Sequence, residues 1–174
     1  AYSELFQNYS KEQIEGYLNY AWRESNGNGL MVHYAETHDN SRLAAVSENY
    51  ARMRTALSAL ASVNGAFGFA NGVEWFAKEK IDVHESCGLS WGATPNLVEF
   101  IGKLNTLLLT VPAFHNGASM TFLNSGSPNA VVFRRTGASG NGTVLCAVNL
   151  DCEHPALIQW NADDAGACGL AAYD

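Results

Sequence analysis

The residue types best suited to chemistry lie close together in residues 36–42, with the sequence Glu-Thr-His-Asp-Asn-Ser-Arg. An imidazole and a guanidinium can bind sugar hydroxyls, while a carboxylate opposes a developing positive charge, so the segment suits a polyhydroxylated substrate. A purely structural interpretation has Asp39 or Asn40 capping the following turn and Arg42 as a solvated charge. Spacing alone does not separate the two interpretations.

Three helices are predicted from apolar periodicity. The first begins after Ser10, which forms a capping box with the glutamine three residues later. The second begins near Ser47. The third is expected to open at Thr94, with Pro95 in its first turn, and to close at Pro112.

Two short apolar runs, residues 30–35 and 65–70, lie between these helices. Neither run alternates with polar residues, which is typical of strands covered on both faces in a parallel sheet. After residue 116 the chain becomes rich in turns. Four further strand-like runs are then predicted, at residues 120–123, 130–134, 144–149 and 156–160.

This order predicts an α/β part followed by an all-β part. Residues 1–115 are expected to form the last two βα units of an incomplete (β/α)8 barrel, and residues 116–174 a small antiparallel β domain that is cut short. The chain begins at Ala1 without a signal-like segment, so it is interpreted as a piece of a larger protein. The barrel edge beside residues 30–35 should then pair with another chain or promote self-association.

Composition narrows the classes of partner. The chain of 174 residues has 10 basic and 17 acidic side chains, a net charge of −7, which argues against nucleic-acid binding. No apolar run is long enough to cross a membrane. The four cysteines are too few and too unevenly spaced for a disulfide framework, so they are expected to be reduced thiols in a cytoplasmic protein.

Residues 34–42 resemble the His-Asp motif at the end of the seventh barrel strand in the α-amylase family of glycoside hydrolases (family 13). The resemblance continues along the chain. Residues 71–74 (Asn-Gly-Val-Glu) are similar to the exit of the eighth strand, residues 101–114 to the last barrel helix, and residues 130–150 to the start of the C-terminal β-sandwich.

The resemblance implies a retaining glycosidase or transglycosidase that acts on α-glucans without a cofactor. Asp39 matches the carboxylate that stabilises the transition state, and His38 matches a histidine that binds sugar hydroxyls. Asn40 and Arg42 are further candidates for substrate binding, and Arg42 alternatively holds the carboxylates in place. The nucleophile and the acid/base belong to the fourth and fifth strands, which this chain lacks, so the chain alone is expected to be inactive.

Several alternatives stay open at this point. Hydrolysis, branching, debranching and glucanotransfer are not separated, nor is calcium binding elsewhere in the parent protein. A non-catalytic carbohydrate-binding or scaffolding module from a degenerate barrel is the second interpretation. The G-x-S-x-G pattern at residues 88–92 would make Ser90 a hydrolase nucleophile, but the polar residues before it favour a loop. Asp82, His84, Glu85 and Cys87 match no known metal-binding spacing, so no metal site is predicted.

Overall fold

The computed structural model describes residues 10–85, 88–161 and 163, and combines helices with a three-stranded antiparallel sheet. The α-helices are α2 (Lys11–Gly27), α3 (Leu43–Val46), α4 (Glu48–Leu60) and α5 (Val98–Thr110). The strands are β1 (Ser119–Leu123), β2 (Ala130–Thr136) and β3 (Thr143–Asn149). Short 3₁₀ turns are η1 (Val63–Gly65), η2 (Val73–Trp75), η3 (Pro112–Phe114) and η4 (Ala138–Gly140).

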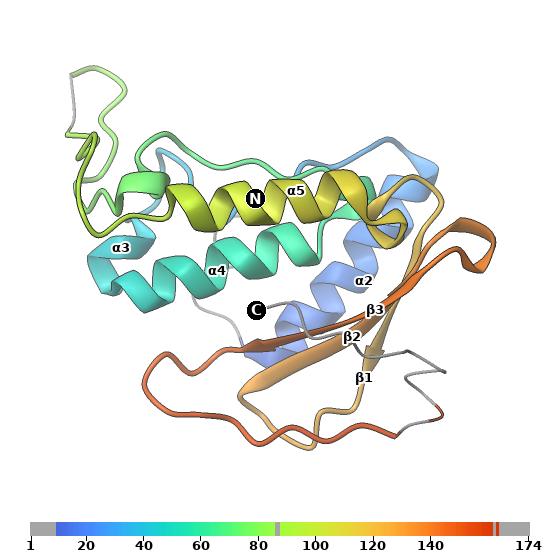
Figure 1. Cartoon of the computed structure of the whole chain (residues 1–174). Coiled ribbons are helices and arrows are strands. Elements are labelled where there is room, and N and C mark those ends of the chain that lie inside the picture. Colours follow the sequence, from blue (N-terminus) through green and yellow to red (C-terminus); the bar gives the residue numbers. More distant parts are fainter. Residues whose placement is uncertain (1–9, 86–87, 162, 164–174) are drawn as a thin grey trace.

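The helices lie over the sheet. Helices α4 and α5 run side by side, and α2 lies at an angle to both and contacts β2 (Figure 1). The sheet has the strand order β1-β2-β3, with Phe122 opposite Phe133 and Phe133 opposite Cys146. The rings of Phe122 and Phe133 meet edge to face with their centroids 5.7 Å apart, a favoured arrangement for a cross-strand aromatic pair.

The first two predicted helix starts are confirmed. The Ser10 hydroxyl accepts the N–H of Gln13, and the Gln13 side chain accepts the N–H of Ser10, so α2 begins with the expected capping box. Helix α4 begins after Ser47, whose hydroxyl accepts the N–H of Tyr50. Both caps use local hydrogen bonds between neighbouring residues, which explains why the sequence indicates them.

The predicted start of the third helix is wrong. Helix α5 begins at Val98 rather than at Thr94, so Pro95 lies before the helix and not in its first turn. The Asn96 side chain accepts the N–H of Val98 and thereby satisfies one of the free donors at the helix start. The N–H of Leu97 donates to the carbonyl of Glu74, which fixes where this turn meets the preceding loop.

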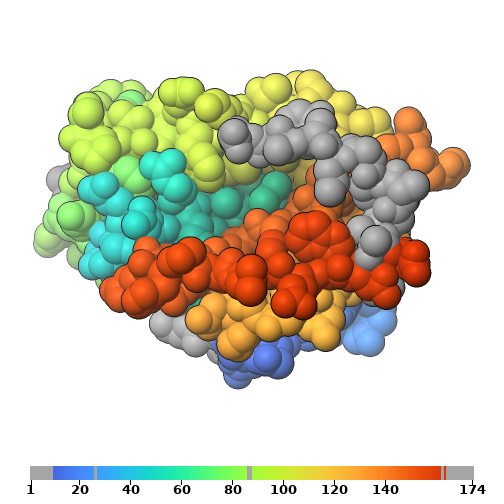
Figure 2. Space-filling view, turned by 60° about the horizontal axis from the view of Figure 1, so that its bottom comes forward, coloured from blue at the N-terminus to red at the C-terminus, as the bar shows by residue number. Residues whose placement is uncertain are grey.

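Three of the four predicted strands after residue 116 are confirmed as β1, β2 and β3. The fourth, residues 156–160, is wrong, because this segment is irregular. The backbone N–H of Gln159 donates to the carbonyl of Ser125, which connects this segment to the β1–β2 loop. Figure 2 shows the chain after β3 running along one face of the molecule, between the helices and the β1–β2 hairpin.

The two runs predicted as parallel strands form one bridge instead of a regular ladder. His33 and Phe67 pair in parallel, with His33 donating to the carbonyl of Ala66 and accepting from the N–H of Gly68. Outside this bridge neither run is assigned to a strand, and Gly65, the first residue of the second run, ends the η1 turn with a φ of +71°. A parallel ladder is stable chiefly inside a larger sheet, and among the described residues this pair has no third strand beside it.

One buried cluster joins the helices to the sheet. It includes Leu18 of α2, Leu57 of α4, Leu104 of α5, and Phe133 and Cys146 of the sheet. The residues on the two sides of the predicted domain boundary, 1–115 and 116–174, therefore contribute to one hydrophobic core.

Arg135 of β2 lies at the centre of this contact between helices and sheet. Its guanidinium is fully buried and donates to the carbonyls of Leu60, Ser62 and Ala113, at 2.7–2.9 Å. It also faces the rings of Trp22 and Phe114, at 5.1 and 4.4 Å from their centroids. A buried guanidinium is tolerated where carbonyl oxygens and aromatic faces replace its lost hydration.

Within the described residues no helix combines the length and the apolar character that a bilayer crossing requires. Cys146 and Cys152 are free thiols, and burial raises the pKa of Cys146 to about 12. Cys87 and Cys168 lie outside the described residues.

Candidate functional site

His38 and Asp39 lie in a tight turn that follows the extended residues 30–35. The hydroxyl of Thr37 accepts the N–H of Asp39 at 3.2 Å and donates to the side-chain oxygen of Asn40 at 2.9 Å, so one side chain organises the turn. His38 Nε2 lies 3.3 Å from Asp39 Oδ1. The Asp39 side chain is 79% exposed, which leaves its carboxylate accessible to a ligand.

His38 and Asp39 line an open pocket of about 360 Å³. Its other wall comes from residues 80–83, which contribute Lys80 and Asp82. The structure thus brings two of the four predicted site residues, His38 and Asp39, to one concave surface. Asn40 is half-buried. Its side-chain oxygen accepts the hydroxyl of Thr37, and this hydrogen bond stabilises the turn.

Arg42, the fourth predicted site residue, is buried and does not line the pocket. Its Nε lies 2.6 Å from the carboxylate of Glu36, and its Nη2 donates to the carbonyl of Asn71 at 2.8 Å. The interpretation of Arg42 as a solvated charge is therefore wrong. In this structure Arg42 pairs with Glu36, a carboxylate that was not among the predicted site residues.

Glu36 is the buried partner in this ion pair. Its Oε2 accepts the N–H of Leu43 at 2.7 Å, at the start of α3. Burial raises the pKa of Glu36, an effect opposed by the Leu43 N–H and by Arg42 and increased by Glu74. Glu36 and Arg42 thus anchor both ends of the loop that carries His38 and Asp39.

The same ion pair connects this loop to the next one. Gly72 adopts a φ of +95°, and a Cβ at this position would lie 2.8 Å from Arg42 Nη2. The Glu74 carboxylate accepts the N–H of Gly72 at 2.9 Å, so Glu74 stabilises the loop that follows the second paired segment. Sequence reasoning missed this connection, because residues 36–42 and residues 71–74 are about thirty positions apart in the chain.

The other sequence motifs form no site of the expected geometry. Ser90 has a φ of +53°, but the described residues 80–85 and 88–89 before it form no strand and no helix directly follows it, so the described residues do not have the arrangement of a hydrolase nucleophile. Among residues 10–85, 88–161 and 163, no cluster of three or more metal-binding side chains occurs. Cys87, considered for such a cluster, lies outside the described residues.

Comparison with known proteins leaves the family of this chain unassigned. No protein-family model matches the chain, and no curated protein matches it significantly.

Proposed function

We propose that this chain forms the last two βα units of an α-amylase-type barrel together with the β domain that follows, and acts on α-glucans. The observation that carries the proposal is the parallel pairing of His33 with Phe67, with α4 between the paired segments and α5 after the second. A parallel bridge with a helix between its two segments is what two consecutive βα units would produce, and it supports the proposal. Asp39 follows the carboxyl end of the first segment, where barrel enzymes place their catalytic side chains.

In this proposal Asp39 stabilises an oxocarbenium-like transition state. The sugar ring gains positive charge as the glycosidic bond breaks, and a fixed carboxylate binds this charged state more strongly than the neutral ground state. His38, 3.3 Å from Asp39, orients the carboxylate and binds a sugar hydroxyl. Asn40, Glu36 and Arg42 act indirectly, by fixing the turn that presents both side chains.

The remaining chemistry comes from residues that this chain does not supply. In the family that the sequence resembles, the nucleophile and the acid/base follow the fourth and fifth barrel strands, whereas residues 30–35 and 65–70 correspond to the seventh and eighth. A stabilising carboxylate without these partners supplies only part of the barrier reduction. We place the reaction in the cytoplasm, in agreement with the small number and uneven spacing of the cysteines in the sequence.

The test compares the 174-residue chain with the complete natural polypeptide that contains it. We expect the chain alone to release no reducing sugar from starch, and the complete polypeptide to do so. In the complete polypeptide, Asp39→Asn should lower kcat roughly a hundred- to a thousandfold, because a neutral amide does not oppose the developing charge. Far-UV circular dichroism checks that the variant remains folded.

Asp151→Asn is the matched control. Asp151 also lies 3.3 Å from a histidine, His154, but after β3 and away from the proposed site. We expect its kcat to stay within about twofold of the parent. Starch cleavage by the 174-residue chain, or full activity in Asp39→Asn, would contradict the proposal. Glucan binding by a complete polypeptide that never cleaves it would favour the non-catalytic module instead.

A further inference from the structure

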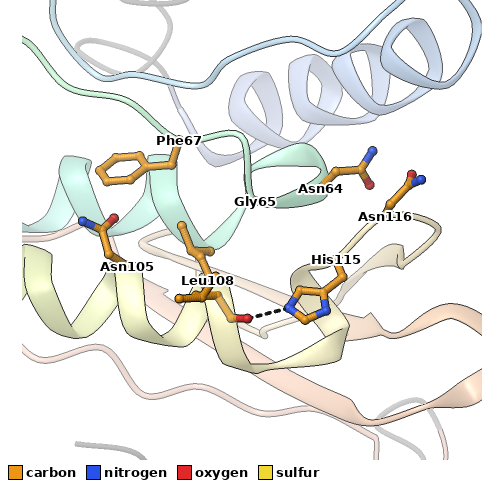
Figure 3. A pocket seen from close by; sticks show the side chains of 8 residues that line it. Asn64, Gly65, Phe67, Asn105, Leu108, His115 and Asn116 are labelled. Carbon is orange, nitrogen blue, oxygen red and sulfur yellow. Dashed lines mark hydrogen bonds between the residues drawn. The ribbon is translucent and has the colours of Figure 1, made fainter.

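A second pocket, of about 440 Å³, lies between the η1 turn and α5. Figure 3 shows Asn64 and Asn116 on one side, Asn105 and Phe67 on the other, and the side chain of Leu108 between them. The volume lies in the range of small-molecule sites.

The amide groups of this pocket have unused hydrogen-bonding capacity. The side chains of Asn64, Asn105 and Asn116 make no hydrogen bond with any other described residue. Three carboxamides around one pocket present six N–H donors and three carbonyl acceptors, the mixture that a ligand rich in hydroxyls requires.

His115 adds a directed acceptor. Its Nε2 lies 2.9 Å from the carbonyl of Leu109, as the dashed line in Figure 3 shows. A carbonyl only accepts, so Nε2 carries the proton and Nδ1 of the neutral ring is an acceptor. The ring orientation is thus set by the protein before any ligand binds.

The lining carries no Asp, Glu, Lys or Arg side chain. The described lining offers a phosphate or carboxylate ligand no lysine or arginine and offers an amine no carboxylate, so a neutral ligand is favoured. Phe67 and Leu108 supply apolar surface beside the amides. A sugar ring combines an apolar C–H face with peripheral hydroxyls and therefore matches both kinds of surface.

We propose that this pocket binds one or two neutral sugar residues, at a site separate from Asp39. The paired segments run parallel, with Asn64 before the amino end of the second and Asp39 after the carboxyl end of the first. The two pockets therefore lie toward opposite ends of this pair. Binding here needs neither Asp39 nor any catalytic partner, so it does not depend on the proposed reaction.

The test is a titration of the ¹⁵N-labelled 174-residue chain with maltose, followed by NMR. We expect the side-chain amide signals of Asn64, Asn105 and Asn116 to shift together, with a Kd on the order of millimolar, as is ordinary for an open site with few contacts. Asn105→Ala should raise this Kd roughly three- to tenfold, the effect of one or two lost hydrogen bonds. The histidine ring signals of His115 should move with the same titration curve.

Asn19→Ala is the matched control, because Asn19 is likewise an exposed helical asparagine without a hydrogen bond to a described residue. It should leave the Kd unchanged, and so should Asp39→Asn, which separates this site from the proposed catalytic one. Glucose 6-phosphate should bind no more tightly than glucose. Three outcomes would each overturn the proposal: no shifts at these amides, a Kd insensitive to Asn105→Ala, or preference for the phosphorylated sugar.

Discussion

Gly72 lies against the guanidinium of Arg42 in a backbone conformation that favours glycine. In Gly72→Ala the new methyl group would approach Arg42 Nη2 to 2.8 Å and the Cβ of Ala77 to 2.9 Å. We expect the free energy of unfolding to fall by about 2–4 kcal/mol, the sum of left-handed strain and overpacking. Urea denaturation measures this change.

Gly92→Ala provides the control for this substitution. Gly92 has a similar φ of +75°, but an added Cβ would meet no atom within 4 Å. Its cost should be only the backbone strain, about 1–2 kcal/mol. Equal destabilisation by the two substitutions would show that the contact between Gly72 and Arg42 contributes nothing.

His33 makes the stability of the fold dependent on pH. Burial, with a further contribution from the charge of Arg135, lowers the pKa of His33 to about 4. The unfolded chain titrates near pH 6.5, so between these values it binds a proton that the folded chain does not. The stabilisation is complete above about pH 6.5 and is lost as the pH falls toward 4, by about 3 kcal/mol.

The measurement is the free energy of unfolding at pH 7 and pH 4 in the parent and in His33→Asn. The variant should lose less stability on acidification, whatever its stability at pH 7. His84→Asn, which changes an exposed histidine, should keep the parent's pH dependence. Glu36 has the opposite effect on the free energy of unfolding. Burial raises its pKa, so the folded chain binds a proton at this carboxylate more readily than the unfolded chain, and acidification stabilises the fold through this group. An unchanged pH dependence in His33→Asn would therefore contradict the assignment to His33.

At the scale of elements, Arg135 connects the sheet to the end of α4 and to η3. Arg135→Met would remove the hydrogen bonds to the carbonyls of Leu60, Ser62 and Ala113 and leave these acceptors buried. We expect a loss of about 3–5 kcal/mol in the free energy of unfolding. Arg135→Lys should recover only part of it, because an ammonium group does not reproduce the planar fork.

Arg134→Met is the control. It tests whether the loss in the free energy of unfolding comes from replacing any arginine of β2 or from removing the carbonyl contacts of Arg135. Arg134 neighbours Arg135 in β2 and is half-buried. Because the Arg134 side chain is partly exposed to solvent whereas Arg135 is fully buried, its substitution should cost less than that of Arg135. A loss at Arg134 as large as that at Arg135 would contradict the role given to the three carbonyl contacts.

At the scale of the whole molecule, residues 30–35 present apolar side chains to solvent. Leu30 is 56% and Val32 50% exposed, beside a segment that pairs through one bridge. We expect the chain to self-associate along this edge, since exposed apolar strand edges promote pairing. Light scattering should show particles larger than the monomer, and Val32→Lys should shift the distribution toward monomer.

Leu157→Lys is the control for charge and solubility. Leu157 is also strongly exposed but lies in the segment after β3. It should leave the size distribution unchanged. A strictly monomeric parent chain, or equal effects of the two lysine substitutions, would contradict association through residues 30–35.

The sequence by itself determined the features that rest on local interactions. The caps at Ser10 and Ser47 bond to N–H groups three residues away, and the strands β1 to β3 are delimited by turn residues next to them. The predicted start of α5 at Thr94 is wrong because Asn96 caps the helix and a hydrogen bond from Leu97 to the distant Glu74 holds the residues before it, a contact that no local pattern specifies. The strand predicted at residues 156–160 failed because a strand requires a partner, which no local pattern specifies.

Only the tertiary structure decided which polar groups meet. Arg42 and Glu36 lie in the segment that the sequence marked for chemistry, yet burial against Asn71 gives them a positioning contact while His38 and Asp39 remain exposed. The pocket that includes Asn64 and Asn105 joins residues about forty positions apart, so no spacing in the chain indicates it. Local hydrogen bonds act over a few residues, whereas burial and long-range contacts depend on how distant segments pack.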